Sequence, residues 1–354
     1  MPRLRRSDCA SAGYARRKRG RGFEYLNSDG TRIGDLQVLQ RIKDLHIPPA
    51  WIDVWICPFD NGHLQAVGTD TAGRKQYLYH TAWRQRRDQE KFDRMIEFAK
   101  ALPKIRHFTN EHLDHSGLGR ERVLACAARL LDRGFFRVGG EDYAEENETY
   151  GLATIRKDHV RFEGRSVVFE YVAKSNKERI QSIVDPEVYE VVRALKRRRS
   201  GGPELLAYKL GSRWRDVKSS EINEYLKEIS GGDYTAKDFR TWHGTVLCAR
   251  ALAVSRGALG SKTGRKRAVS RAIQEVSHYL GNTPAVCRAS YVDPKVIDRY
   301  DSGVTIAPVI EKLADEDFDE PAIQVAFEEA VLDLIEGNTR SPDVEKVNPA
   351  KLSA

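Results

Sequence analysis

The stretch SHYLGNTPAVCRASYVDP, residues 277–294, contains the boundary between two predicted helices and a tyrosine shortly after it. Leu280 and Gly281 are typical of a helix that ends in a glycine cap, because glycine adopts the left-handed backbone conformation easily. Residues 282–284, Asn-Thr-Pro, indicate a new start, with a capping side chain followed by proline in the first turn. Tyr291 then lies two turns along the second helix. Tyrosines are usually half buried with a wet hydroxyl, so its importance depends on residues upstream.

Helical spacing of apolar residues dominates the chain around this stretch. A two-residue alternation at Val167, Phe169 and Tyr171 instead predicts a β-hairpin or three-stranded ribbon within residues 151–174. We therefore predict a mainly helical domain over residues 103–338 with this β-hairpin inside it. Its predicted helices are residues 121–133, 186–199, 221–229, 236–254, 265–280 and 322–335.

Short β-like runs separated by turn residues fill residues 21–82, which predicts a small antiparallel sheet domain. The basic residues 1–20 lack periodicity, so we expect a flexible arm. The amphipathic residues 83–102 predict a connecting helix, and residues 339–354 form a tail. The fold class is therefore α+β, with a small N-terminal antiparallel β-sheet domain and a larger mainly helical domain. Within the small domain, the predicted strands are residues 23–26, 51–57, 63–68 and 75–80, and the predicted helix is residues 36–45.

The composition indicates a globular protein of the reduced cytosol. With 354 residues the chain is long enough for two cores, and 31 % charged residues favour solubility. No apolar run reaches the length of a membrane span, and no apolar segment follows the basic N-terminus, so we expect neither an anchor nor a signal peptide. The five cysteines are odd in number and scattered without a C-x-x-C pair, which argues against disulfides and a zinc site. We expect a cytoplasmic protein.

The charge distribution points to a polyanionic partner. The net charge is +8, and basic residues gather in several segments while residues 311–320 are acidic. Such asymmetry is expected for a protein that binds nucleic acid, although ordinary solvated helix faces are the alternative. The basic segments are residues 3–21, 84–94, 196–199 and 265–271.

A predicted strand, RKQYLY at residues 74–79, places Lys75, Tyr77 and Tyr79 on one face and Gln76 and Leu78 on the other. Phenol hydroxyls and basic groups donate to phosphates, and glutamine can reach a base edge. The alternative is an amphipathic strand with tyrosines that fill a core. The strand is therefore a candidate DNA-binding element.

Three basic residues occur where an anion could be bound. Arg137 precedes two glycines that permit a close backbone approach, although pairing with Glu141 or Asp142 is the commoner arrangement. Lys174 stands at the end of the predicted ribbon, where a lysine is usually just solvated. Arg240 lies among apolar residues of a predicted helix, and a half-buried arginine requires an anion from the protein or from a substrate.

Several chemistries have no motif in this sequence. There is no G-x-x-x-x-G-K-[ST], no H-E-x-x-H and no dense carboxylate cluster. An ATP-driven motor, a zinc protease and a two-metal nuclease are therefore disfavoured, and we expect no cofactor and no metal ion.

Taken in order, Arg137, Lys174, Arg240, Asn282 and Tyr291 resemble the active-site set of type IB DNA topoisomerases, in particular the bacterial and poxvirus-like branch. The resemblance covers nearly the whole chain. Besides Lys174, the segments that carry it are GRKQYLY at 73–79, RVG at 137–139, ENETYGL at 146–152, KDFRT at 237–241, and GNTP at 281–284 with Tyr291.

This resemblance implies a mechanism. Tyr291 would attack a phosphodiester and hold DNA through a 3′-phosphotyrosyl bond. Because a phenol of pKa near 10 is only about 0.1 % ionised at neutral pH, neighbouring groups must offset roughly 4 kcal/mol. Arg137, Arg240 and Asn282 would donate to the phosphate in its five-coordinate transition state, and Lys174 would protonate the leaving 5′ oxygen. The enzyme would relax supercoiled DNA without ATP or metal.

The resemblance also implies how DNA is held. Two domains would close as a clamp around duplex DNA, with the protein acting as a monomer, associated with the nucleoid and without an obligatory protein partner. Asn282 replaces the histidine of poxvirus enzymes, and Gly140 replaces their base-contacting lysine, which puts a strong sequence preference in doubt. The predicted DNA-binding residues are Arg74, Lys75, Gln76, Tyr77, Tyr79, Tyr143 and Lys237.

Two other functions fit part of this pattern. A site-specific tyrosine recombinase uses almost the same residues but usually has histidine where Lys237 stands, three residues before Arg240. A non-catalytic basic DNA-binding protein would bind DNA without a covalent adduct. Random relaxation of a supercoiled plasmid favours the topoisomerase, whereas exchange between defined sites favours the recombinase.

Overall fold

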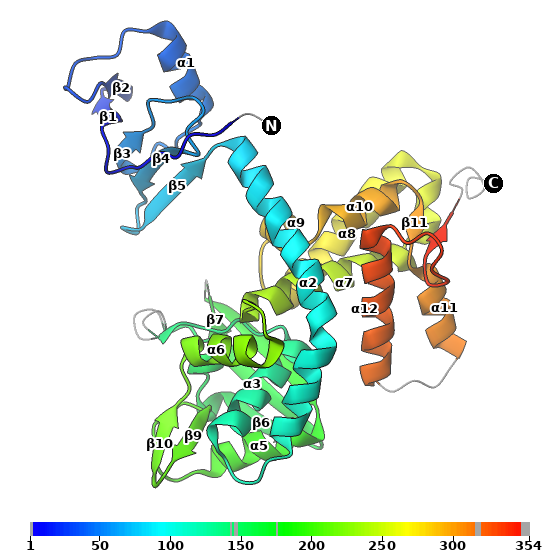
Figure 1. Ribbon diagram of the computed structural model, residues 1–354. Coiled ribbons are helices and arrows are strands. Elements are labelled where there is room, and N and C mark those ends of the chain that lie inside the picture. The colour runs from blue at the N-terminus through cyan, green and yellow to red at the C-terminus, as the bar shows by residue number, and fades with distance from the viewer. Residues whose placement is uncertain (1–2, 142–143, 145–147, 175, 316–319, 348–354) are drawn as a thin grey trace. The chain divides into compact units, whose positions relative to one another are not determined.

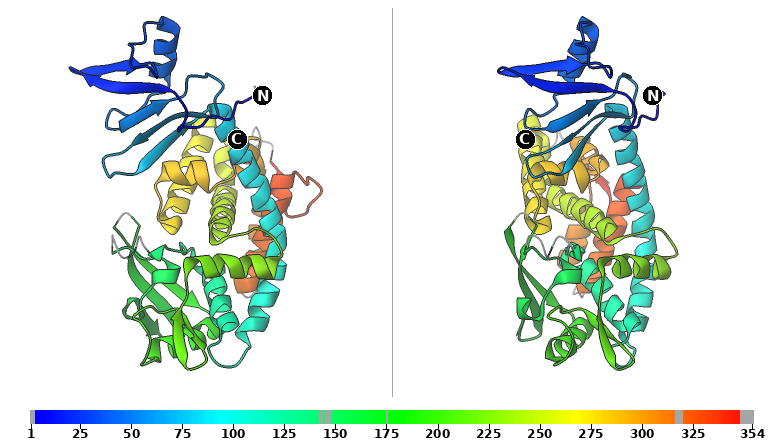
Figure 2. Two further views of the ribbon diagram at one scale, coloured as in Figure 1. Left: turned by 60° about the vertical axis from the view of Figure 1, so that its left-hand side comes forward. Right: turned by 90° about the vertical axis from the view of Figure 1, so that its left-hand side faces the viewer.

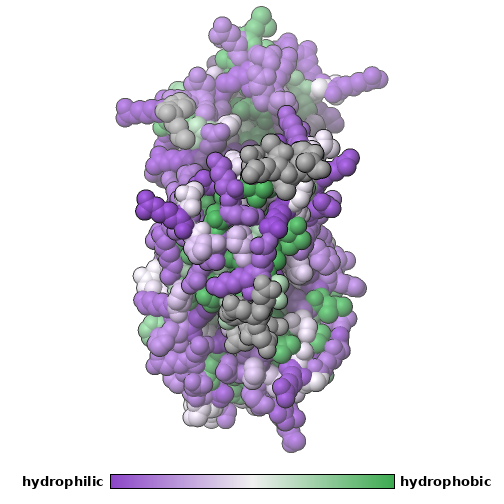
Figure 3. Space-filling view, turned by 90° about the vertical axis from the view of Figure 1, so that its right-hand side faces the viewer, coloured by the Kyte–Doolittle hydropathy of each residue, from purple (hydrophilic) through white to green (hydrophobic). Residues whose placement is uncertain are grey.

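The computed structural model describes residues 3–141, 144, 148–174, 176–315 and 320–347. The chain forms two compact units, Met1–Asp93 and Arg94–Ala354 (Figure 1). In the described ranges, no helix is both long enough and apolar enough to span a membrane. The face drawn in Figure 3 is mostly hydrophilic, with hydrophobic side chains in small separate groups.

The first unit is built on a five-stranded antiparallel sheet with the strand order β2-β1-β3-β4-β5. Helix α1, Leu36–Asp44, begins at Asp35, whose side chain accepts from the first-turn backbone N–H groups. Ile42 of this helix joins Val54, Ile56 and Ala66 of the strands in one buried cluster. The predicted small antiparallel sheet is therefore confirmed. The strands are β1 Tyr14–Arg19, β2 Gly22–Leu26, β3 Ile52–Ile56, β4 Leu64–Thr69 and β5 Lys75–Tyr79.

The predicted flexible arm, residues 1–20, is wrong from residue 14 onward, because Tyr14–Arg19 form β1 between β2 and β3. Basic residues here do not prevent strand formation, since residues 15–19 pair with β2 along the strand, and Tyr14 and Ala15 also pair with β3. The Arg16 guanidinium donates to three loop carbonyls and lies 4.2 Å from the ring centroid of Phe23. The basic segment at residues 14–19, whose composition suggested a mobile segment, thus forms a strand of the sheet.

Helix α2, Thr81–Leu113, is 33 residues long, whereas the sequence predicted an end at residue 102. Pro103 lies inside it, and an internal proline costs about 3 kcal/mol or more. Ile105 and Leu113 continue the buried face beyond the proline, at 2 % and 1 % exposure. Their burial offsets the lost backbone hydrogen bond, so a proline was a poor stop signal here.

The second unit is mainly helical, which confirms the predicted fold class (Figure 2). Helix α7, Ala236–Val254, has the predicted bounds; it buries Phe239 and Trp242 completely and contacts α3, α6, α8, α10, α11 and α12. The other helices are α3 Arg120–Gly134, α5 Pro186–Arg197, α6 Ser219–Ser230, α8 Lys262–Leu280, α9 Pro284–Ser290, α10 Pro294–Asp301, α11 Ala307–Asp315 and α12 Glu320–Glu336, with short 3-10 turns at Leu152–Thr154, Lys157–His159 and Arg256–Gly260.

The predicted hairpin at residues 151–174 is a three-stranded ribbon that begins and ends later. Its strands are β6 Val160–Glu163, β7 Ser166–Ala173 and β8 Lys177–Val184, and Lys174 lies in the turn between β7 and β8. Strand β8 was missed because five of its eight residues are exposed and its polar sequence KERIQSIV has no clear alternation. The strand nevertheless pairs with β7 along its whole length.

Two further short pairs of strands were not predicted. Strands β9, Ala207–Leu210, and β10, Arg213–Asp216, form one pair, and β11, Val304–Thr305, pairs with β12, Glu345–Lys346. The second pair includes part of the predicted tail at residues 339–354. The tail is therefore folded against the unit as far as Val347, whose N–H donates to the carbonyl of Gly303.

Candidate active site

The junction between α8 and α9 has the predicted geometry. Gly281 caps α8 with a φ of +62°, in the left-handed region that favours glycine. The side chain of Thr283 accepts from the N–H of Val286, and Pro284 is the first residue of α9. Tyr291 follows the last turn of α9, and its N–H donates to the carbonyl of Cys287.

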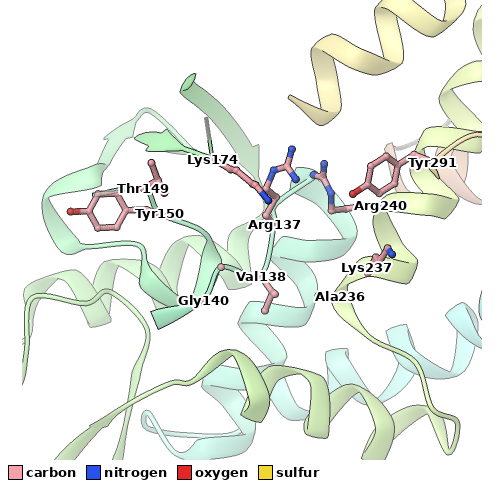
Figure 4. A pocket seen from close by; sticks show the side chains of 11 residues that line it. Arg137, Val138, Gly140, Thr149, Tyr150, Lys174, Ala236, Lys237, Arg240 and Tyr291 are labelled. Atoms are coloured by element: carbon pink, nitrogen blue, oxygen red, sulfur yellow. The ribbon is translucent and has the colours of Figure 1, made fainter. Parts of the chain in front are cut away.

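A cavity of about 270 Å³ opens beside this junction. Figure 4 shows Lys174 and Arg137 reaching in from one side, with Arg240 and the hydroxyl end of Tyr291 facing them. Four of the five predicted catalytic residues therefore line one cavity, although α7, the β7–β8 turn and the end of α9 are distant in sequence. The lining residues are Arg137, Val138, Gly139, Gly140, Thr149, Tyr150, Lys174, Ala236, Lys237, Arg240 and Tyr291.

Arg240 is 4 % exposed and donates to three oxygens. Its Nη1 donates to the carbonyl of Phe135 at 2.6 Å, and its Nη2 donates to the carbonyl of Leu280 at 2.7 Å and to Oδ1 of Asn282 at 2.8 Å. Burial, and then the charge of Arg137, lower the pKa of Arg240 to about 10. Within the described residues no carboxylate pairs with it, and its Nε has no hydrogen-bond partner. This buried charge can be compensated by an external anion.

Asn282 links the two arginines, although it is not among the residues that line the cavity. Its Oδ1 accepts from Nη2 of Arg137 at 2.7 Å and from Nη2 of Arg240 at 2.8 Å. Because two guanidinium donors fix the oxygen end of the amide, the NH2 end must point away from them. The side chain thus holds both arginines and keeps its own donors for another acceptor.

Arg137 does not make the ion pair with Glu141 that was the common alternative. Glu141 instead accepts from the N–H and Oγ of Ser219 at the start of α6, and Asp142 lies outside the described residues. Gly139, with a φ of +86°, comes close to the backbone of Gly151 rather than leaving room for a ligand. A Cβ on Gly139 would lie 3.0 Å from the Cα of Gly151, so these glycines allow two chain segments to pack.

Arg179 of β8 is part of the same arrangement and was missed by the sequence reasoning. Its guanidinium donates to the carbonyls of His278 at 2.9 Å and Tyr279 at 2.5 Å. Burial lowers its pKa. Together with Arg137 and Arg240, it supplies charged donors to the carbonyls at the C-terminus of α8 and to that of the cap residue Gly281. The ribbon was predicted to end at residue 174, so the sequence did not place Arg179 on a strand near the site.

Tyr291 lies against Arg240. The ring centroid is 5.2 Å from the guanidinium carbon, and the residue is 9 % exposed. A cation over an aromatic ring is attracted by its electron-rich face. Whether Tyr291 is held before a substrate arrives was left open by the sequence; in the structure its ring is packed and oriented.

The predicted DNA-binding residues of the first unit divide into two groups. Tyr77 and Tyr79 are 46 % and 40 % exposed and stack with centroids 6.2 Å apart, so they do not fill a core. Lys75 is exposed on the same face of β5. Arg74 and Gln76 instead donate to Asp70, whose pKa is lowered to about 2, first by the backbone N–H of Arg74.

The remaining two predicted DNA-binding residues belong to the second unit. Lys237 lies on α7, one turn before Arg240, and lines the cavity. Tyr143 lies outside the described residues. Lys237 therefore joins the wall that carries Arg240 and Tyr291.

A buried acidic cluster elsewhere in the second unit was also missed. Asp132, His243 and Glu328 offer three atoms within 4.8 Å of one another that could bind a metal ion. Arg106 already donates to both carboxylates, at 2.7 to 2.9 Å. Burial alone would raise the pKa of Asp132, but the Arg106 charge holds it well below its usual range. The cluster therefore acts as an ion-pair network that joins α2, α3 and α12.

Comparison with known proteins places these observations in a family. Residues 80–313 match the model of the eukaryotic DNA topoisomerase I catalytic core, and residues 22–70 match the model of the bacterial DNA topoisomerase IB N-terminal domain. The chain is 28 % identical over 295 residues to DNA topoisomerase 1B of Acanthamoeba polyphaga mimivirus, covering 81 % of this chain and 87 % of that protein. It is 23 % identical over 233 residues to DNA topoisomerase 1B of Vaccinia virus, covering 66 % of this chain and 71 % of that protein.

The catalytic-core match alone includes more than half of the chain and contains the whole cavity wall. The N-terminal match includes strands β2, β3 and β4 of the five-stranded sheet of the first unit, together with α1. The chain therefore belongs to the type IB DNA topoisomerase family.

Proposed function

We propose that this chain relaxes supercoiled duplex DNA by cutting one strand, holding it through a phosphotyrosyl bond to Tyr291, and resealing it. The observation that carries this proposal is the buried guanidinium of Arg240, 5.2 Å from the Tyr291 ring and without a carboxylate partner in the described residues. Arg137 and Lys174 line the same cavity. A phosphodiester is an anion that such a wall would bind.

In the proposed cleavage step, the Tyr291 hydroxyl oxygen forms a bond to phosphorus while the bond from phosphorus to the 5′ oxygen breaks. Lys174, in the β7–β8 turn, donates a proton to the leaving 5′ oxygen. The phenol proton is released to solvent. Resealing is the reverse reaction. Because the phosphotyrosyl bond retains the energy of the phosphodiester, the cycle requires no ATP.

Arg137, Arg240 and Asn282 are proposed to stabilise the transition state, in which additional negative charge develops on the non-bridging oxygens. The arginines are oriented by backbone carbonyls and by Oδ1 of Asn282. The amide NH2 of Asn282 is the donor that remains for the phosphate. Such preorganised donors need little rearrangement as the reaction proceeds.

The proposed partner is duplex DNA alone, bound by a monomer whose two units close around it as a clamp, in the cytoplasm at the nucleoid. The exposed face of β5, with Lys75, Tyr77 and Tyr79, supports DNA contact by the first unit. Lys237 on the cavity wall supports contact by the second unit.

Removing the side chains of β5 that are proposed to contact DNA is expected to lower the affinity for duplex DNA more than the rate of strand cleavage. The double variant Tyr77→Ala, Tyr79→Ala should bind duplex DNA about 30-fold more weakly, since two lost hydrogen bonds of about 1 kcal/mol each contribute about 2 kcal/mol. For Lys75→Ala, log affinity should fall less steeply with log salt concentration, by about 1 in the slope, because one phosphate contact is lost. Titrations at several salt concentrations measure both effects. Phe23→Ala on β2, the opposite edge of the sheet, is the control and should bind normally.

Arg179→Met is expected to slow strand cleavage about tenfold and to lower the unfolding temperature. The variant leaves the carbonyls of His278 and Tyr279 without their charged donor, and such a bond contributes about 1.5–3 kcal/mol. Single-turnover cleavage and thermal unfolding are the measurements. Arg161→Met on β6 removes an exposed ion pair of the same ribbon and should change neither. Wild-type cleavage by Arg179→Met would show that Arg179 does not support the site.

The proposed function is tested with supercoiled plasmid and protein in buffer with chelator and no nucleotide. We expect a ladder of relaxed topoisomers and, after rapid denaturation, a covalent adduct that maps to Tyr291. Exchange restricted to defined sites would instead indicate a recombinase. A mobility shift that disappears after protease treatment, without an adduct, would indicate a non-catalytic DNA-binding protein.

A further inference from the structure

Helix α7 touches the backbone of Tyr291 directly at Gly244. A Cβ placed on Gly244 would lie 2.6 Å from the carbonyl oxygen of Tyr291 and 3.2 Å from its Cβ. Atoms in ordinary contact are about 3.4 Å apart or more. Glycine therefore permits an approach between α7 and the tyrosine that a larger residue would prevent without movement.

Thr245, the next residue of α7, holds the chain on both sides of Val292. The threonine is fully buried, and its Oγ1 accepts from the N–H of Asp293 at 3.1 Å. Its single hydroxyl hydrogen has three acceptors in reach, the carbonyl of Thr241 at 2.9 Å, the carbonyl of Tyr291 at 3.3 Å and the sulfur of Met95 at 3.3 Å. The side chain thus bonds to the backbone just after Val292 and lies within hydrogen-bond distance of the carbonyl just before it.

The same helix carries Arg240, one turn before Gly244. Residues four positions apart lie on one helix face, so Gly244 lies one turn beyond Arg240 on the same face, and Thr245 is the next residue of the chain. The Tyr291 ring packs against the guanidinium of Arg240 while its backbone rests on Gly244 and Thr245. The position of the phenol relative to the arginine is therefore set by a single rigid element.

We propose that Gly244 and Thr245 are positioning residues that set Tyr291 in register with Arg240. The inference rests on the proposed function, in which Tyr291 is the nucleophile. Reactive groups must be held within a few tenths of an ångström of the productive geometry, and a 1 Å displacement can slow a reaction about 100-fold. Relieving the 2.6 Å contact in Gly244→Ala requires a shift of about 0.8 Å.

The test compares single-turnover cleavage by the full chain at saturating protein with DNA affinity and thermal unfolding. Thr245→Val keeps the shape but removes the hydroxyl, and should slow cleavage at least tenfold while DNA affinity stays within twofold. Thr245→Ser restores the hydroxyl and should recover most of the rate. Gly244→Ala should slow cleavage about 100-fold. The matched control is Thr241→Val, since the Thr241 hydroxyl bonds only to Lys237 of its own helix in the described residues.

Each result bears on the inference. Wild-type cleavage by Thr245→Val, failure of Thr245→Ser to restore the rate, or a parallel loss of cleavage, DNA affinity and folding would overturn it. If the valine variant does not fold, Thr245→Ala carries the same expectation. A wild-type chain that forms no adduct overturns the proposed function and this inference with it, whereas normal adduct formation by wild type and by all variants overturns only the positioning role.

Discussion

Tyr291→Phe is expected to bind duplex DNA with the affinity of the wild type and to relax none of it. The substitution removes only the hydroxyl oxygen that is proposed to bond to phosphorus, and the ring retains its contact with Arg240. Without that oxygen no covalent adduct can form, so both relaxation and the denaturant-trapped adduct should fall below detection. Plasmid relaxation, adduct trapping and an equilibrium binding titration measure the three quantities.

A second tyrosine gives the matched control for this result. Tyr189→Phe makes the same chemical change on α5, where the ring packs edge-on against Phe162 at 5.0 Å between centroids. That variant should relax plasmid at the wild-type rate. If Tyr291→Phe kept relaxing DNA, Tyr291 would not be the nucleophile. If it lost DNA binding as well, the ring would be more important for structure than the proposal allows.

Arg240→Met is expected to reduce the rate of strand cleavage by about 10³, with a much smaller change in stability. Removing one transition-state donor typically costs about 2.7–4 kcal/mol. The guanidinium is buried without a carboxylate partner, and burial lowers its pKa to about 10, so its charge is unfavourable in the free protein. Methionine relieves that penalty, which offsets part of the lost hydrogen bonds to Phe135 and Leu280. Single-turnover cleavage should therefore become about 10³-fold slower, while the unfolding temperature changes little.

Arg240→Lys distinguishes charge from geometry at this position. Lysine keeps a positive charge but cannot donate in two fixed directions, as the guanidinium does toward Phe135 on one side and Leu280 on the other. We expect a cleavage rate between those of the wild type and Arg240→Met. A lysine variant as slow as the methionine variant would assign the effect to geometry, and full activity of Arg240→Met would contradict the proposed role of Arg240.

The parts of the fold that could be predicted from sequence have strong local causes. Helix α7 matched its predicted bounds because its apolar residues repeat with helical spacing over 19 residues. The break between α8 and α9 could be located because Gly281, Thr283 and Pro284 each favour one backbone conformation. The alternation along β5 likewise predicted that Lys75, Tyr77 and Tyr79 share one face, whereas the exposure of that face was known only from the structure.

The parts that could not be predicted depend on tertiary contacts. Strand β1 is basic and aperiodic, and it forms because β2 and β3 pair with its backbone. Arg179 is recognisable only when β8 is seen beside the end of α8. The network of Asp132, His243 and Glu328 forms around Arg106, which lies 26 positions from Asp132 and 222 positions from Glu328. Helical and strand periodicity extends over much shorter stretches, so it does not predict such contacts.

The three guanidiniums at the end of α8 are anchored mainly to main-chain carbonyls, those of residues 278–281. Every amino acid type supplies such a carbonyl. The exposed side chains of His278 and Tyr279 can therefore change during evolution without removing the acceptors that orient Arg179. The site should therefore tolerate mutation of the exposed residues at the end of α8 but not of the arginines. Among related sequences, we expect more variation at those helix positions than at Arg137, Arg179 and Arg240.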